Sequence, residues 1–218
     1  MYLQFGTPKR LSALRVPLQD MAYRKRNTQI AIIDDKPFPK AEVLHNHKFN
    51  IIELGDIKSI DQIAEYPIVV CDIRGVGKHF GSEFEGAHLI FEIRKAYPDK
   101  FLVTYTGAQF DIAYNESLKG VDVSIAKDAS TEQWVDALER GVEKVTDPIK
   151  RWIRFRSDLM DRGVGAYEVF CLEQGFIKAI ESKDETKLKL TNLSDDIRDI
   201  VVAFIKYALV PIIKLLAS

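Results

Sequence analysis

The stretch Ile68-Val69-Val70-Cys71-Asp72 decides the fold of this chain and ends in its most informative side chain. Four apolar residues without polar alternation predict a strand that is buried on both faces, and the strand ends in a carboxylate. Three other apolar runs also end in polar side chains: 30–33 before Asp34 and Asp35, 101–105 before Thr106, and 123–126 before Lys127. We therefore expect three acids, a hydroxyl and an ammonium group along one edge of a sheet.

Strand and helix patterns alternate from residue 30 to residue 146. The expected strands are 30–34, 50–54, 68–72, 101–105 and 122–126, and the expected helices are about 38–48, 59–66, 83–97, 109–119 and 130–145. Apolar strands separated by helices predict a parallel sheet covered on both faces, and right-handed crossovers make it an open, doubly wound α/β sheet. Ligands of such sheets bind at the carboxyl ends of the strands, where the polar side chains above are expected.

The sequence on either side of this α/β segment differs from it. Residues 1–29 hold six Lys or Arg against one Asp and lack sustained periodicity, so we expect a basic N-terminal arm with at most one short helix. Beyond Asp147-Pro148 only helical patterns occur, at about 148–162, 165–182 and 194–216. The chain is therefore divided into the arm 1–29, a domain at 30–146 and an all-helical module at 147–218.

The composition is that of a globular protein in a reducing compartment. Of the 218 residues, 46% are hydrophobic and 29% are charged, and the net charge of −1 gives no general attraction to nucleic acid or anionic membranes. The two cysteines have no zinc-binding spacing and no signal peptide is recognisable, so we expect a cytoplasmic protein. Four charged residues interrupt the apolar stretch 197–217, and we expect no transmembrane segment.

The predicted sheet edge suits a carboxylate that accepts a phosphoryl group. Such a reaction requires an ionised and exposed nucleophile, a divalent metal to neutralise the donor phosphate, and cationic or hydroxyl groups to hold the remaining oxygens. Asp72 is the candidate phosphoacceptor, and the candidate ligands of Mg²⁺ are Asp34, Asp35, Asp72 and the backbone carbonyl of Arg74. The net charge of −7 over residues 30–146 fits such a cluster or, equally, a solvated acidic surface.

Two further side chains complete the candidate site. Lys127 is expected to pair with Asp72 before transfer and with the phosphoryl group after it. Thr106 is expected to donate a hydrogen bond to a phosphoryl oxygen, so that its movement reports the modification to neighbouring helices.

These residues resemble the motifs of the receiver domain of two-component response regulators. The matching segments are Ile32-Ile33-Asp34-Asp35, Val69-Val70-Cys71-Asp72, Val103-Thr104-Tyr105-Thr106-Gly107 and Ile125-Ala126-Lys127. The resemblance covers residues 30–146, which is about half of the chain. It implies a flavodoxin-like (βα)₅ fold, a Mg²⁺ cofactor and phosphorylation of Asp72 by a partner histidine kinase.

The chain departs from the receiver pattern in four ways. Asp128 stands where receivers usually have a proline after the lysine, and Ser124 stands where many receivers have an aromatic switch residue. The usual relay from threonine to aromatic ring is therefore in question here. The loop after Asp72 is long and basic, and it either covers the phosphate or is a solvated insertion. The arm at residues 1–29 also lies outside the receiver pattern.

The helical module lacks the features of common output domains. Its charge of +1 and the lack of a recognisable helix-turn-helix argue against nucleic-acid binding. No histidine lies beyond residue 88, which excludes a histidine phosphotransfer domain, and no catalytic cluster is recognisable. The apolar face along 197–216 is broader than three helices are expected to bury, so we expect a homodimer or a partner contact through it.

Particular residues are expected to shape the packing of this module. Trp152 and Phe155 should anchor it, while three arginines of the same helix form a solvated face: Arg151, Arg154 and Arg156. Pro211 should kink or end the last helix near Tyr207, because proline has no backbone N–H to donate.

Together these patterns predict a response regulator without enzymatic or DNA-binding output, which signals through dimerisation or contact with an unknown downstream protein. Three alternatives stay open: a phosphate sink that drains the kinase, a pseudo-receiver that binds partners without accepting phosphate, and an aspartyl-phosphate phosphohydrolase. The hydrolase is disfavoured because Arg74 stands two residues after Asp72, where hydrolases of the haloacid-dehalogenase type carry a second acid.

Overall fold

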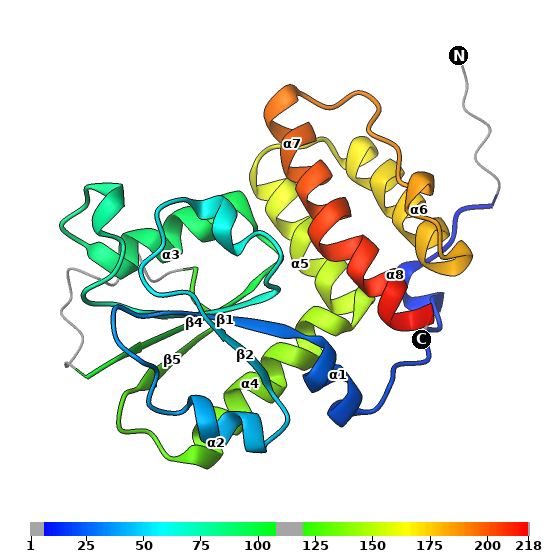
Figure 1. Ribbon diagram of the computed structural model, residues 1–218. Coiled ribbons are helices and arrows are strands. Elements are labelled where there is room, and N and C mark those ends of the chain that lie inside the picture. Colours follow the sequence, from blue (N-terminus) through cyan, green and yellow to red (C-terminus); the bar gives the residue numbers. More distant parts are fainter. Residues whose placement is uncertain (1–6, 108–119, 218) are drawn as a thin grey trace. The chain divides into compact units, whose positions relative to one another are not determined.

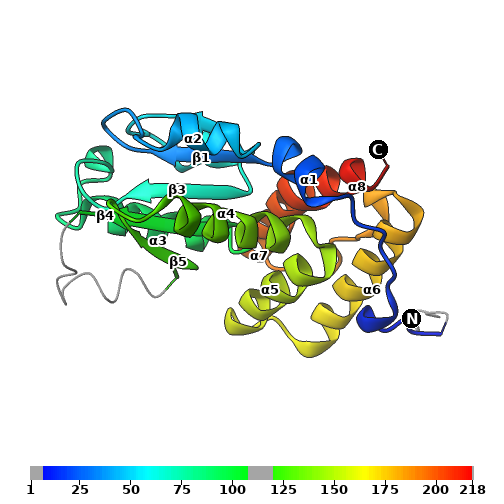
Figure 2. The same ribbon diagram turned by 90° about the horizontal axis from the view of Figure 1, so that it is seen from below.

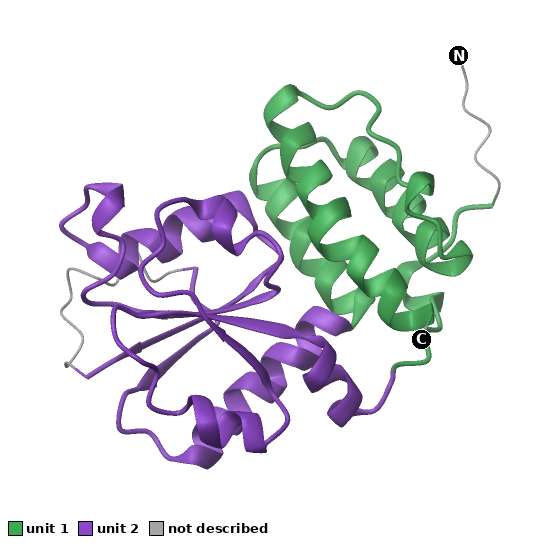
Figure 3. Cartoon of the chain, viewed as in Figure 1, with its two compact units in different colours: residues 1–18, 147–218 green, residues 19–146 purple. Residues whose placement is uncertain are grey.

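The computed structural model describes residues 7–107 and 120–217, and the chain divides into two compact units (Figure 1, Figure 3). One unit comprises residues 19–146 and contains the sheet. The other is helical and combines residues 1–18 with residues 147–218. The chain thus passes from the sheet unit back to the helical unit at Asp147, where the sequence has its Asp-Pro boundary.

The sheet has five parallel strands in the order β2-β1-β3-β4-β5 (Figure 1). The strands are β1 Gln29–Ile33, β2 Asn50–Glu53, β3 Ile68–Asp72, β4 Phe101–Thr106 and β5 Val123–Ala126. This is the order of the flavodoxin-like doubly wound fold, in which the reversal between β1 and β3 opens a crevice at the carboxyl ends of the strands. The predicted fold class is confirmed, and the predicted strands agree with the observed ones to within one residue at each end.

Helices cover both faces of the sheet. α3 (Glu85–Ala96) lies on one face, and α2 (Ala41–Asn46) and α4 (Thr131–Thr146) lie on the other (Figure 1, Figure 2). On the α2 and α4 face, Ile68 and Val70 of β3 are fully buried in a core that includes Trp134 of α4. Each such aliphatic side chain that leaves water contributes roughly 1.5–3 kcal/mol to the free energy of unfolding.

Two expected helices need comment. The helix expected at 59–66 is instead a single 3₁₀ turn, Ile60–Ile63, and its N-terminus is capped by the side chain of Ser59. Pro67 disfavours a helical conformation at the residue before it, and β3 begins at Ile68, so the segment is too short for an α-helix. The helix expected at 109–119 lies outside the described residues.

Residues 1–29 do not form one basic arm, which corrects the expected division. Within them, α1 (Met21–Asn27) belongs to the sheet unit, where Lys25 lies 2.5 Å from Glu139 of α4. Leu11 and Leu14 are instead buried in the core of the helical unit. Basic residues outnumber acidic ones in this segment, but these two leucines and the helix α1 decide where it packs.

The first described residues are also held by hydrogen bonds to the helical unit. The backbone N–H of Lys9 donates to Oε1 of Gln174, and Nε2 of Gln174 donates to the carbonyl of Lys9, each at 2.9 Å. Gln174 is buried, so its amide requires hydrogen-bond partners within the protein, and the main chain of Lys9 provides them for both the oxygen and the nitrogen. This pair of bonds fixes the position of the segment along α6.

The helical unit contains α5 (Pro148–Asp161), α6 (Ala166–Ser182), α7 (Asp195–Phe204) and α8 (Val210–Ala217). Asp147 caps α5 by accepting hydrogen bonds from two backbone N–H groups of the first turn. Four aromatic rings fill the centre of the unit: Trp152 stacks on Phe176 at 4.7 Å between centroids, and Phe155 stacks on Phe204 at 4.0 Å. Trp152 and Phe155 thus anchor this packing.

The apolar face along α7 and α8 is mostly used within the unit itself. Its residues Val201, Phe204 and Leu209 lie in the same core as Leu11 and Leu14. The sequence argument did not count these N-terminal leucines as packing partners, and so it left too much of this face for another protein. The exposed large apolar side chains of the described helices α5, α6 and α7 are Ile153, Met160, Tyr167, Phe170 and Val202.

Within the described residues, Asp195–Ala217 is the one helical stretch long and apolar enough to cross a membrane, judged by length and composition alone. The core helix of a globular unit passes the same test. Because Val201 and Phe204 are buried in the helical core, this finding is weak evidence of a membrane span.

Pro211 changes the helix near Tyr207, as expected, without ending it. A π-helical turn, Ile205–Leu209, joins α7 to α8, and Pro211 lies in the first turn of α8. Pro211 has no N–H to donate to the carbonyl of Tyr207, and the guanidinium of Arg151 donates to that carbonyl at 3.3 Å. Arg151 is buried, so the expectation that it lies on a solvated face was wrong.

Replacing Arg151 with methionine should lower the free energy of unfolding by about 1–3 kcal/mol, because the Tyr207 carbonyl loses this donor. The cost should be smaller in a Pro211→Ala background, because the restored backbone N–H can donate to the same carbonyl. Chemical denaturation of the wild type, the two single variants and the double variant measures both effects. The exposed Lys150→Met is the matched control, with an expected change below about 0.5 kcal/mol. Equal costs in the two backgrounds would contradict this account of the turn.

Candidate functional site

The carboxyl ends of β1 and β3 bring three carboxylates together. The two strands pair in parallel with Ile33 opposite Cys71, so that the residues after them, Asp34 and Asp72, come to the same edge. One carboxylate oxygen from each of Asp34, Asp35 and Asp72 lies within 4.8 Å of the other two. Asp34 and Asp72 are buried, whereas Asp35 is exposed. The structure therefore assembles the predicted acids, and their role as metal ligands stays a prediction.

Lys127 reaches Asp72 from the far side of β4. It follows β5, and its Nζ lies 2.5 Å from Oδ2 of Asp72. Its backbone N–H donates to the carbonyl of Thr106 at 3.1 Å, which fixes the start of the loop at the end of β4. The side chain of Asp72 is 4% exposed and that of Lys127 is 41% exposed. The expectation that the nucleophile is exposed was therefore wrong, because the pair joins a buried carboxylate to a cation that solvent can reach.

The remaining predicted site residues, Arg74 and Thr106, follow β3 and end β4 at the same edge of the sheet. Oδ1 of Asp72 accepts a hydrogen bond from the backbone N–H of Arg74 at 3.3 Å, so the main chain turns tightly here. The Arg74 carbonyl belongs to the same turn, and coordination of a metal by it stays a prediction. Thr106 is buried as the last residue of β4, between the strands that carry Asp72 and Lys127.

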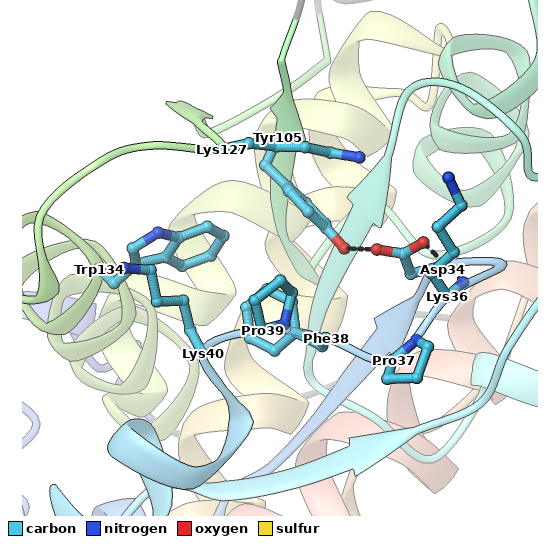
Figure 4. Close-up of a pocket in the computed structure, with 9 residues that line it drawn as sticks. All are labelled: Asp34, Lys36, Pro37, Phe38, Pro39, Lys40, Tyr105, Lys127 and Trp134. Carbon is cyan, nitrogen blue, oxygen red and sulfur yellow. Dashed lines mark hydrogen bonds between the residues drawn. The ribbon is translucent and has the colours of Figure 1, made fainter.

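Sequence reasoning missed Tyr105, which contacts the acidic cluster directly. Its hydroxyl donates to Oδ2 of Asp34, while Oδ1 of Asp34 accepts from the backbone N–H of Lys36 at 2.9 Å (Figure 4). The available signal was its register, since Tyr105 is the residue of β4 that pairs with Asp72 of β3. Burial, then the hydrogen bond to Asp34, raises the pKa of Tyr105, so its hydroxyl keeps its proton and remains a donor.

The loop after β3 folds back beside the acidic cluster. Gly75 has φ of +86°, and a Cβ at this position would lie 2.8 Å from Oδ2 of Asp35. The left-handed backbone favours glycine here, and any Cβ would require the Asp35 carboxylate to move. The ammonium of Lys78, from the same loop, lies 3.9 Å from Oδ2 of Asp35.

Two acids outside the predicted set anchor this loop. The backbone N–H of Gly75 donates to Glu85 at 2.8 Å, and that of Gly77 donates to Asp56 at 2.6 Å. Sequence reasoning missed both acids, because each accepts from a backbone N–H that is distant along the chain, and such a contact leaves no local pattern. The loop is thus fastened next to the cluster. Whether it covers a phosphate stays a prediction.

A pocket of about 120 Å³ adjoins the cluster (Figure 4). Asp34, Tyr105 and Lys127 form part of its wall, together with the rings of Phe38 and Trp134. The Tyr105 ring lies edge-on to each of these two rings, with centroids 5.5 Å apart. Among the described residues, the indole N–H of Trp134 is a buried donor without a hydrogen-bond partner.

The donor set fits a hard divalent cation. Carboxylates this close repel one another, and Lys127 and Lys78 supply two positive charges against the three carboxylates. Mg²⁺ is bound through carboxylate and carbonyl oxygens and keeps several waters, which suits a site with one exposed edge at Asp35. The residues present therefore fit Mg²⁺ in both charge and ligand type.

No protein-family model matches the chain, and no curated protein matches it. Solved structures do match. A receiver domain protein from Methanospirillum hungatei JF-1 is 15% identical with a TM-score of 0.43, over 53% of this chain and 94% of that one. A response regulator protein from Burkholderia pseudomallei is 17% identical with a TM-score of 0.42, over 76% of this chain and 99% of that one. An adenylate cyclase from Rhodopirellula baltica is 16% identical with a TM-score of 0.41, over 62% of this chain and 98% of that one.

These similarities are weak in sequence, so the fold rests on the strand order and register of this chain. Receiver domains are among the solved structures that it resembles.

Cys71 precedes Asp72 in β3, and its reactivity tests whether this end of the strand is buried. Burial, then the charge of Asp72, raises the pKa of the Cys71 thiol, whose Sγ donates to the carbonyl of Asp72 at 3.1 Å. Alkylation of the native protein at about pH 8 should therefore modify the half-buried Cys171 and spare Cys71, because the thiolate is the reactive form. Peptide mass spectrometry measures both sites. Both should react after unfolding, and equal labelling in the native state would contradict the burial.

Proposed function

We propose that this chain is a response regulator in which Asp72 accepts a phosphoryl group from a histidine kinase. The observation that carries the proposal is the cluster of Asp34, Asp35 and Asp72 at the crevice of the sheet, with the ammonium of Lys127 on Asp72. A phosphoacceptor carboxylate requires a cation site and a mobile positive charge beside it, and this cluster offers both.

In the proposed reaction, an oxygen of Asp72 attacks the phosphorus of the kinase phosphohistidine. The new P–O bond forms as the P–N bond breaks, and the imidazole leaves with the bonding electron pair. Asp34, Asp35, Asp72 and the carbonyl of Arg74 would hold Mg²⁺, which neutralises charge on the phosphoryl oxygens. Lys127 exchanges its contact with Asp72 for a phosphoryl oxygen, and the hydroxyl of Thr106 donates to another. The buried position of Asp72 excludes much of the water that would hydrolyse the product.

The helical unit is proposed as the output, through a homodimer or a downstream protein rather than through nucleic acid or catalysis. Exposed apolar side chains on α5 and α6 support a protein contact: Met160 and Tyr167 are each 56% exposed. The charge of +1 over residues 147–218 gives little attraction to nucleic-acid phosphates. A cytoplasmic location goes with this proposal, because both cysteines are free thiols.

Incubation with Mg²⁺ and a small phosphodonor should add one phosphoryl group to the protein, and Asp72→Asn should abolish the gain. Intact-mass spectrometry measures it, and Asp128→Asn, an exposed acid beyond the end of β5, is the matched control that should retain it. No gain in the wild type, even with a kinase supplied, would favour a pseudo-receiver. Rapid turnover of a phosphate ester would favour a hydrolase.

Phosphorylation should shift the protein toward a dimer or a partner complex, and Met160→Glu should block that shift without reducing phosphorylation, because a charge in an apolar contact is costly. Light scattering after size-exclusion chromatography measures the mass. Ser157→Glu, an exposed polar position of the same helix, is the matched control. Phosphorylation with no change in association would favour a phosphate sink.

A further inference from the structure

Tyr105 differs from the other residues at this site because it touches both the acids and the core. It is 1% exposed, and its hydroxyl donates to Oδ2 of Asp34 (Figure 4). Its ring packs edge-on against Phe38, which follows β1, and against Trp134 of α4. A shift of the Asp34 carboxylate would therefore move the Tyr105 ring against Phe38 and Trp134, on the face of the sheet covered by α4.

The contact with Tyr105 determines how Asp34 presents its oxygens. The backbone N–H of Lys36 holds Oδ1 at 2.9 Å and the Tyr105 hydroxyl holds Oδ2, so the carboxylate cannot rotate freely. Each oxygen has a second lone pair that remains available to a cation. Hydrogen-bond partners that orient a ligand in this way usually account for a 10- to 100-fold effect on metal affinity.

We propose that Tyr105 is a positioning residue for the cation site: its hydroxyl orients Asp34, and its ring links that carboxylate to Trp134. This inference rests on the proposed function, since it takes the acidic cluster to be a Mg²⁺ site. It also assigns the contact between the site and an aromatic ring to Tyr105 of β4. In β5 of this chain, Ser124 stands where many receivers have an aromatic switch residue.

The chemistry of Tyr105 and Trp134 supports this assignment. A tyrosine hydroxyl is protonated at neutral pH, and this one already donates to Oδ2 of Asp34. The ammonium of Lys127 lies 5.2 Å from the centre of the Tyr105 ring, so the ring also adjoins the cation that pairs with Asp72. With its ring centroid 5.5 Å from that of Tyr105, Trp134 is placed to report changes at the site by its fluorescence.

The test is titration of the full-length protein with Mg²⁺, followed by tryptophan fluorescence and by calorimetry. Tyr105→Phe keeps the ring and removes the hydroxyl, and it should weaken Mg²⁺ binding about 10-fold or more. Tyr97→Phe is the matched control, because its hydroxyl also donates to a carboxylate, that of Asp61, at 3.4 Å. Trp134→Phe alters the packing and retains the hydroxyl, and by calorimetry it should bind Mg²⁺ within about threefold of the wild type.

The outcomes separate the inference from the function on which it rests. Equal Mg²⁺ affinity of wild type and Tyr105→Phe would overturn the role of the hydroxyl and leave the metal site intact. Equal weakening by Tyr105→Phe and Trp134→Phe would show that packing matters and not the hydroxyl, and would also overturn it. A wild type that binds no Mg²⁺, or an Asp34→Asn variant that binds it equally well, would overturn both the metal site and this inference. Circular dichroism checks that each variant is folded.

Discussion

Repulsion among carboxylates at one edge of the sheet is the constraint on which the rest of the sheet unit depends. Two unit charges about 4 Å apart repel by about 4 kcal/mol at an effective dielectric constant near 20, a large fraction of the stability of a typical domain. Each acid therefore has its own partner: Lys127 for Asp72, Tyr105 for Asp34 and Lys78 for Asp35. These partners come from three different loops or strands, so the acidic edge organises side chains that are far apart in the sequence.

The residues at this edge were predictable because main-chain geometry determines them. Parallel strands place their carboxyl ends together, so Asp34, Asp72 and Lys127 could be located from the ends of apolar runs alone. Tyr105 could not, since the same run is equally consistent with its ring lying on either face of the sheet. The anchoring of the loop through Asp56 was also beyond the sequence, because it depends on the path of a loop and not on a repeating pattern.

The helical unit shows a different limit. Its helices and its boundary at Asp147 follow from periodicity and from an Asp-Pro pair, and these signals are local. The placement of Leu11 and Leu14 in its core is not local, because their partners lie more than a hundred residues further along the chain. Arg151 shows the same limit in reverse: its charge suggests a solvated position, but the carbonyl of Tyr207 beside Pro211 gives it a partner in the interior.

The order of these segments has a consequence for synthesis on the ribosome. The sheet unit is continuous along the chain, so all of its strands are available once residue 146 has emerged. The helical unit is not, because Lys9 and Leu11 precede the sheet unit in the chain and the helices of their unit follow it. Domains fold as units, but here the segment that precedes the sheet unit must remain without its helical partners while the entire sheet unit is translated. The helical unit can therefore complete its core only after the sheet unit has been translated, and Leu11 and Leu14 lack their core partners until then.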